Sequence, residues 1–163
     1  VAVYTSQLAA EEGIPFILDG GGASASFRLN KLQKVDIFSP NETETALITG
    51  IRPDTLDDCL RASMAICSQT AVGYVVLKLG ARGCYIYDGK YCDLIAPFDV
   101  QAVDTTAAGD AFTAALATEF LRTGDITASA RYANAVGALT VTTAGAINAL
   151  PTRETVRRFL EQI

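Results

Sequence analysis

The chain has 163 residues, of which 50% are hydrophobic and 19% are charged, a composition typical of one globular domain with a substantial core. The net charge of −5 and the lack of a basic stripe argue against a nucleic-acid partner. No apolar run approaches the roughly 18 residues of a membrane span, and no signal or transit peptide is recognisable. We therefore expect a cytoplasmic protein without a membrane partner, with an organelle left open as its location.

Missing residue types limit the chemistry further. The chain has no histidine, which excludes most zinc sites and any nucleophile activated by histidine. The pattern G-x-x-x-x-G-K-[ST] does not occur, which excludes a P-loop NTPase. Four cysteines show no C-x-x-C pairing and are expected to be buried free thiols in a reducing compartment. These are Cys59, Cys67, Cys84 and Cys92.

Hydrophobic periodicity and turn residues predict helices and strands along the whole chain. In chain order we expect a helix at 4–13, a strand at 15–19, a loop at 19–26, a weak helix at 29–34, a strand at 35–39, helices at 42–49 and 55–68, strands at 74–79, 83–87 and 90–95, and helices at 108–123, 126–142 and 152–163.

This alternation predicts an α/β layered fold with a mostly parallel sheet flanked by helices. The last two strands form a β-hairpin around Asp88-Gly89, a dipeptide preferred in type I′ turns. Leu56, Leu60, Ala62, Met64 and Cys67 are the candidate core residues of the helix at 55–68.

The start of the helix at 108–123 is the most informative segment. Thr105 or Thr106 offers a hydroxyl for its N-cap, and small residues at 107–109 leave the first-turn N–H groups bare. The helix dipole makes this a place for an anion such as a terminal phosphate. Asp110 lies beside it and is suited to accept a proton from an attacking hydroxyl, which points to phosphoryl transfer. The alternative is that Asp110 only complements the helix dipole.

A second constellation lies in residues 39–44, Ser-Pro-Asn-Glu-Thr-Glu. Asn41 follows a strand and precedes Glu44 by three residues, the spacing of a helix capping box. The end of a strand in an α/β sheet is also where ligands bind, and a carboxylate there suits hydrated Mg²⁺. Capping and metal binding are compatible, and the sequence leaves both open.

Three segments resemble motifs of the ribokinase-like (PfkB) carbohydrate kinases. Residues 104–112, Asp-Thr-Thr-Ala-Ala-Gly-Asp-Ala-Phe, resemble the signature D-T-x-[GA]-[AG]-G-D-x-F. Residues 40–44 resemble the N-x-x-E motif, and Leu-Gly-Ala-Arg-Gly at 79–83 resembles the L-G-x-x-G segment along the nucleotide. The resemblance covers nearly the whole chain, is strongest to the ribokinase branch, and extends only over the C-terminal half of such enzymes. It implies that residues 1–163 are the C-terminal part of a single ribokinase-like domain, without its N-terminal half and lid.

The resemblance also implies roles for individual residues. Asp110 is the catalytic base, and Glu44 organises Mg²⁺ through water. The anion hole is formed by Ala107, Ala108 and Gly109, with the amide of Asp110. The nucleotide-binding residues are Asn41, Lys78, Gly80, Arg82, Gly83 and Asn134. The potassium candidates, mostly through backbone oxygens, are Asp104, Thr106, Thr140, Thr143, Gly145 and Ala149.

Some of these positions also have simpler explanations. Asn134 lies on a helix of small residues, where a polar side chain commonly faces solvent. The two glycines at 80 and 83 are compatible with turn geometry alone. The Asp-Gly-Gly-Gly run at 19–22 departs from the pattern of many relatives, and we assign no ligand to it.

The implied reaction is the ATP-dependent phosphorylation of a sugar primary hydroxyl, D-ribose to ribose 5-phosphate, with Mg²⁺ and K⁺. The family's sugar contacts and β-lid lie in the N-terminal half, so the sequence does not identify the sugar or establish that this chain is active alone. Two alternatives stay open: a non-catalytic nucleotide-binding fragment, and a fructokinase-type sugar kinase. The expected partners are the sugar and ATP, and relatives suggest a homodimer of the full-length protein.

Overall fold

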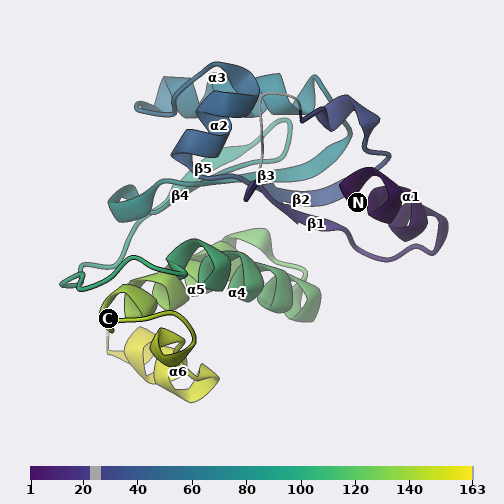
Figure 1. Cartoon of the computed structure of the whole chain (residues 1–163). Helices are drawn as coiled ribbons and strands as arrows, with labels where there is room; N and C mark the ends of the chain where they lie inside the picture. Colours follow the sequence, from purple (N-terminus) through teal and green to yellow (C-terminus); the bar gives the residue numbers. More distant parts are fainter. Residues whose placement is uncertain (23–26, 163) are drawn as a thin grey trace. The chain divides into compact units, whose positions relative to one another are not determined.

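The computed structural model describes residues 1–22 and 27–162 and has the predicted α/β fold (Figure 1). The chain divides into two compact units. The first comprises Val1–Gly80 and Tyr85–Leu94, and the second Ala81–Cys84 and Ile95–Ile163. The predicted loop at 19–26 is described as far as Gly22; residues 23–26 lie outside the described part.

A five-stranded sheet belongs, apart from two end residues, to the first unit. Its strands follow the chain in spatial order and are β1 (Ile17–Asp19), β2 (Val35–Ser39), β3 (Val72–Lys78), β4 (Cys84–Tyr87) and β5 (Cys92–Ile95). β1 pairs with β2 and β2 with β3 in parallel, with Asp19 opposite Ser39 and Val75 opposite Phe38. The mostly parallel sheet is confirmed, and the carboxyl ends of its first three strands lie at one edge.

Helices α2 (Glu42–Thr49) and α3 (Leu56–Cys67) lie on one face of this sheet (Figure 1). The unit also contains α1 (Ala2–Glu11) and short 3-10 turns at η1 (Leu29–Lys31) and η2 (Gly80–Arg82). Its core is apolar and includes Leu29, Phe38, Cys59, Ile66, Val75, Leu77 and Leu79. α2 begins and ends where the sequence predicted, and Gly50 closes it in the left-handed conformation.

Two local predictions in this unit are wrong. Leu56 and Met64 are about half exposed rather than core residues, because Cys59, Ala62, Ser63 and Ile66 form the buried stripe of α3. The hairpin lies where predicted, but its turn is not type I′, which would place Asp88 at positive φ. Instead the Asp88 carboxylate accepts hydrogen bonds from the amides of Lys90 and Tyr91.

The cysteines are free thiols, as predicted. Cys59 and Cys84 are buried and Cys67 is half-buried, whereas Cys92 is exposed, contrary to expectation. Within the described residues no helix has both the length and the apolar character needed to cross a membrane.

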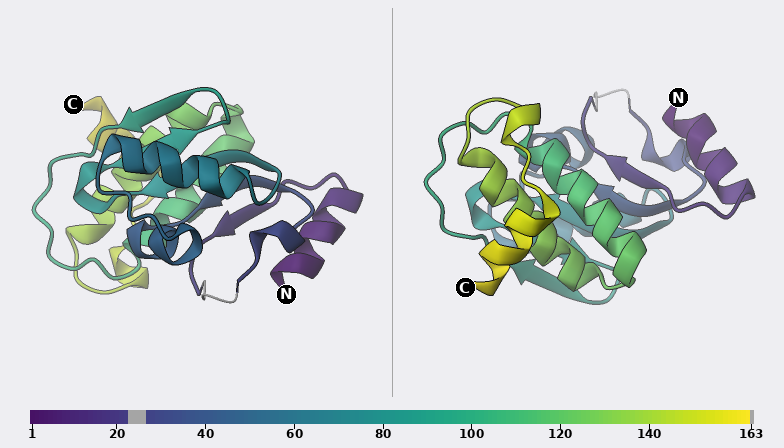
Figure 2. Two further views of the ribbon diagram at one scale, coloured as in Figure 1. Left: turned by 90° about the horizontal axis from the view of Figure 1, so that it is seen from above. Right: turned by 90° about the horizontal axis from the view of Figure 1, so that it is seen from below.

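The second unit is helical. α4 (Ala108–Thr123) and α5 (Ile126–Val141) form a helical hairpin and run side by side, with α6 (Arg153–Glu161) against α5 (Figure 2). A 3-10 turn, η3 (Ile147–Ala149), precedes α6. α4 has the predicted bounds, because its alanine-rich apolar run ends at Gly124 in the left-handed conformation.

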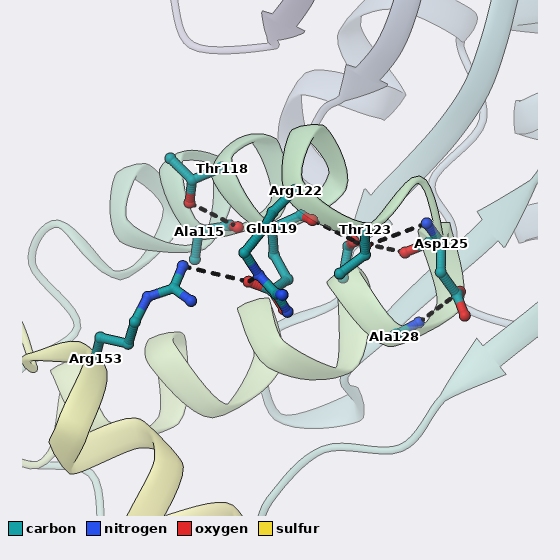
Figure 3. A network of polar contacts seen from close by, with 9 residues as sticks. Ala115, Thr118, Glu119, Arg122, Thr123, Asp125, Ala128 and Arg153 are labelled. Carbon is teal, nitrogen blue, oxygen red and sulfur yellow. Dashed lines mark hydrogen bonds and ion pairs between the residues drawn. The ribbon is translucent and has the colours of Figure 1, made fainter.

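A buried carboxylate links α4 to α6 (Figure 3). Glu119 is 7% exposed, and its two oxygens accept hydrogen bonds from the guanidinium of Arg122. Arg153 adds a contact from Nη2 to Oε2 at 3.4 Å. The hydrogen bond from Arg122 is the main cause that lowers the pKa of Glu119, so the ionised form stabilises the fold.

We expect Glu119→Gln to lower the free energy of unfolding by about 1–2 kcal/mol, because it removes charge-assisted hydrogen bonds at a buried site. The matched control is Glu154→Gln, whose arginine pairs are exposed and for which we expect a clearly smaller loss of stability. Urea denaturation of both variants measures the difference. Equal losses would contradict this account of the Glu119 network.

Candidate functional site

The start of α4 has the shape predicted for an anion site but a different cap. Its N-cap is Ala107, with φ 62 and ψ 1, and no side chain caps the helix. The expectation of a Thr105 or Thr106 cap is therefore wrong. The hydroxyl of Thr106 donates instead to Oδ1 of Asp104 at 2.7 Å.

Two backbone amides at this helix start are left without partners. The amide of Ala108 donates to the carbonyl of Thr105 at 3.3 Å. No described residue accepts a hydrogen bond from the amide of Gly109 or Asp110, and both residues are exposed. Free N–H groups at a helix N-terminus, with the helix dipole behind them, favour an anion. The available donors are thus a subset of the anion hole that the sequence predicted.

The Asp110 side chain lies in this first turn and is exposed. None of the described residues forms an ion pair with it or donates a hydrogen bond to it. An accessible, unpaired carboxylate next to an anion site has the geometry that a general base requires.

Ala107 is the one residue other than glycine with positive φ in the described part of the chain. The left-handed conformation costs a non-glycine residue roughly 1–2 kcal/mol. Such strain persists where the surrounding structure imposes it, and it clusters at binding and catalytic sites. Here it turns the chain so that the helix begins without a capping side chain.

We expect Ala107→Gly to leave the free energy of unfolding unchanged or to raise it by up to about 1 kcal/mol, because glycine adopts this conformation without strain. Ala114→Gly, in the exposed interior of the same helix, is the matched control and should cost about 1 kcal/mol. Thermal and urea denaturation measure both. A loss at position 107 as large as that at position 114 would contradict the strain at Ala107.

Asp104 ties together the loops on either side of this helix start. Its Oδ1 accepts from the amide and hydroxyl of Thr106 at 2.9 and 2.7 Å, and its Oδ2 accepts from the amide of Gly145 at 2.9 Å. The hydrogen bond from Gly145, followed by those from Thr106, lowers the pKa of Asp104 to about 2. The amides of Val103 and Asp104 also donate to the Val141 carbonyl.

The remaining potassium candidates form no hydrogen bond with Asp104 among the contacts of the described residues. Thr140 is buried, its hydroxyl donates to Val136, and its carbonyl accepts from the amide of Thr143. Ala149 is buried in η3. The structure joins Asp104, Thr106 and Gly145 directly. Backbone carbonyl oxygens, such as those of these loops, are ligands that K⁺ accepts.

The Asp104 contacts give a pH dependence of stability. Because the folded-state pKa lies below the usual value of 3.8, ionised Asp104 stabilises the fold above about pH 4, and this contribution is lost as the pH falls towards 2. We therefore expect Asp104→Asn to destabilise most above pH 4 and progressively less at lower pH. Denaturation of both proteins over this range tests it; a difference that stays constant with pH would refute it.

In the first unit, Asn41 and Glu44 form the predicted capping box at the start of α2. Oδ1 of Asn41 accepts from the Glu44 amide at 2.9 Å, and Oε2 of Glu44 accepts from the Asn41 amide at 2.7 Å. In the described part, no cluster of three or more carboxylates or thiolates is positioned to hold a metal. The single half-buried carboxylate of Glu44 would suit a Mg²⁺ ion that keeps most of its water ligands and also binds phosphate.

Lys78, at the end of β3, forms an ion pair that the sequence did not predict. Its Nζ lies 2.6 Å from Oδ2 of Asp19, the last residue of β1. The Lys78 amide donates to the carbonyl of Pro40, which joins β3 to the segment before the capping box. The pair could have been suspected from position, because both residues end strands of a parallel sheet, at the edge where ligands bind.

The other nucleotide-site candidates have clear structural roles. Asn134 is buried, and its amide nitrogen donates to the carbonyls of Ile95 and Ala96 at 3.1 and 3.0 Å, so the alternative of a solvent-facing residue is wrong. Gly83 has φ +87, and a Cβ there would lie 2.1 Å from the Ile95 carbonyl oxygen, so glycine is required. Gly80 and Arg82 bound η2, with Gly80 exposed and Arg82 half-buried.

Comparison with known proteins bears on the identity of these motifs. Residues 4–153 match the pfkB family of carbohydrate kinases. A ribokinase of Arabidopsis thaliana is 34% identical over 99% of this chain and 43% of the relative. The structure of Arabidopsis thaliana ribokinase complexed with ribose and ATP has a TM-score of 0.89 and 32% identity, over 98% of this chain and 52% of that one. Fructokinase-1 of Zea mays is 32% identical over 79% of this chain and 41% of that protein. The chain thus spans about half the length of these relatives, or less.

Proposed function

We propose that this chain, which belongs to the pfkB family of carbohydrate kinases, is the part of an ATP-dependent sugar kinase that binds the nucleotide and carries the catalytic base. The observation that carries the proposal is the start of α4. There, two unpartnered amides and an accessible carboxylate follow a residue held in a strained conformation.

These groups have distinct parts in the reaction. The carboxylate of Asp110 accepts the proton of the sugar's primary hydroxyl. At the same time the hydroxyl oxygen of the sugar attacks the γ-phosphorus of ATP, and ADP leaves. The amides of Gly109 and Asp110 donate hydrogen bonds to the transferring phosphoryl group, whose charge they stabilise. The Asp104 hydrogen bonds keep the preceding loop in place.

The first unit contributes residues for the nucleotide phosphates. Lys78 supplies a positive charge and Asn41 fixes the Glu44 carboxylate, which holds Mg²⁺ through water. Mg²⁺ when bound neutralises phosphate charge, and K⁺ would be held by backbone carbonyls of the loops around Asp104. Gly80, Arg82, Gly83 and Asn134 belong to segments proposed to border the nucleotide.

D-ribose is the proposed substrate, supported by the ribokinase that matches most of this chain. The fructokinase match supports D-fructose as the second candidate. We place the enzyme in the cytoplasm and propose that the full-length protein forms a homodimer.

We expect the folded chain to bind MgATP and Asp110→Asn to bind it at least as tightly, because the side chain acts on the sugar hydroxyl and its charge does not favour phosphate binding. Sugar-dependent ADP release, measured with MgATP, K⁺ and either ribose or fructose, should fall by about 10²- to 10⁴-fold in this variant. Asp125→Asn is the control, since that carboxylate caps the start of α5.

Two outcomes would contradict the proposal. Undetectable MgATP binding by the folded protein would contradict its proposed role in nucleotide binding. Unchanged turnover by Asp110→Asn would contradict the assignment of Asp110 as the catalytic base. Binding without any turnover in the unaltered chain would support the alternative of a nucleotide-binding fragment.

A further inference from the structure

The Asp-Gly-Gly-Gly run at 19–22, to which the sequence gave no role, lies at the carboxyl ends of three parallel strands. Asp19 ends β1 opposite Ser39 of β2, and the amide of Gly20 donates to the Ser39 carbonyl at 3.3 Å. One oxygen of Asp19 accepts from the amide of Gly21 at 2.7 Å, which closes a tight turn. This turn therefore leaves the sheet beside the end of β2.

The other oxygen of Asp19 holds the Lys78 ammonium. Since β2 lies between β1 and β3, the 2.6 Å pair joins strands that are not neighbours and passes over the end of β2. The Lys78 side chain is only 10% exposed and the Asp19 side chain 31%. A lysine so enclosed has its charged end fixed by its partner, unlike a surface lysine with free rotamers.

The same turn lies against the Glu44 carboxylate. A Cβ built on Gly20 would lie 2.5 Å from Oε2 of Glu44 and 2.9 Å from Cα of Pro40. Gly20 is buried, so the absence of a side chain there leaves room for the carboxylate in its capping-box position. Asp19 thus fixes a turn that contacts Glu44 and, separately, the ammonium of Lys78.

We propose that Asp19 is a positioning residue for the phosphate-binding groups of the first unit: it acts through Lys78, and its glycine turn keeps Glu44 in place. This inference rests on the proposed function, since it assigns Lys78 and Glu44 to the nucleotide phosphates. Partners that orient the ligands of a bound metal typically contribute 10- to 100-fold to affinity or activity, and we expect an effect at the lower end of this range for Lys78.

Simple electrostatics predicts the opposite sign. A carboxylate near a polyphosphate repels it, so removing the charge of Asp19 should tighten ATP binding if Asp19 had no orienting role. Positioning predicts weaker binding instead. The sign of the change therefore separates the two explanations.

The test is a double-mutant cycle on the whole chain, with the dissociation constant of MgATP measured by calorimetry. Asp19→Asn keeps an oxygen for the Gly21 amide but removes the negative charge that pairs with Lys78. Lys78→Met keeps the length of the stem without the charge. We expect Asp19→Asn to weaken binding about tenfold. In the Lys78→Met background the same change should no longer weaken binding, because there is no lysine left for Asp19 to orient. Asp19→Glu, which keeps a carboxylate, should bind more tightly than Asp19→Asn.

Stability is separated from positioning by two further measures. Titrations are run at a temperature at which circular dichroism shows every variant folded, and Arg52→Gln, which removes an exposed ion pair of the same unit, should leave the dissociation constant unchanged. The second measure is NMR of the unaltered chain labelled with ¹⁵N-lysine, which does not depend on the stability of any Asp19 variant. We expect the Lys78 Nζ signal, assigned by its loss in Lys78→Met, to exchange slowly with water and to shift on saturation with MgATP.

Several results would overturn the inference alone while MgATP binding persists: equal or tighter binding by Asp19→Asn, effects of the two substitutions that add in the double variant, or a Lys78 signal that MgATP does not move. Failure of the unaltered chain to bind MgATP would instead overturn the proposed function, and the inference with it.

Discussion

The left-handed conformation of Ala107 is the constraint on which the proposed chemistry depends. A side-chain cap would occupy the first-turn amides of α4, whereas the turn at Ala107 begins the helix without one. The conformation is costly for alanine, so something must hold it. The carboxylate of Asp104 accepts hydrogen bonds from the amides of Thr106 and Gly145, and these contacts fix the backbone immediately before Ala107.

The first unit achieves a comparable arrangement by different means. Parallel strands bring the ends of β1, β2 and β3 to one edge, so residues far apart in sequence meet without long loops. The capping box fixes Glu44 through backbone amides, and Asp19 fixes Lys78 by charge. In both units, contacts that hold the local fold also orient the groups proposed to act on phosphate.

Local patterns in the sequence predicted much of this fold. α2 and α4 have the predicted bounds, because their ends carry strong local signals such as Asn41, Gly50 and Gly124. The Asn41–Glu44 capping box was also predictable, since both partners lie within one helical turn. Short elements such as η2 and η3 were missed because they lack hydrophobic periodicity.

Contacts between residues far apart in the chain could not be predicted from the sequence. Nothing local distinguishes Asp19 as the partner of Lys78, 59 residues away, or Asn134 as a donor to carbonyls 38 and 39 residues away. The Ala107 conformation was also unpredictable, because an adjacent threonine offered a better cap by propensity and tertiary restraint overrode it.

The most direct test of the central claim is an NMR titration of the ¹⁵N-labelled chain with MgATP, following the backbone amides. The account predicts that the signals of Gly109 and Asp110 shift strongly with saturable dependence on nucleotide, because their N–H groups receive phosphate. Saturable shifts elsewhere, with these two amides unmoved, would contradict it.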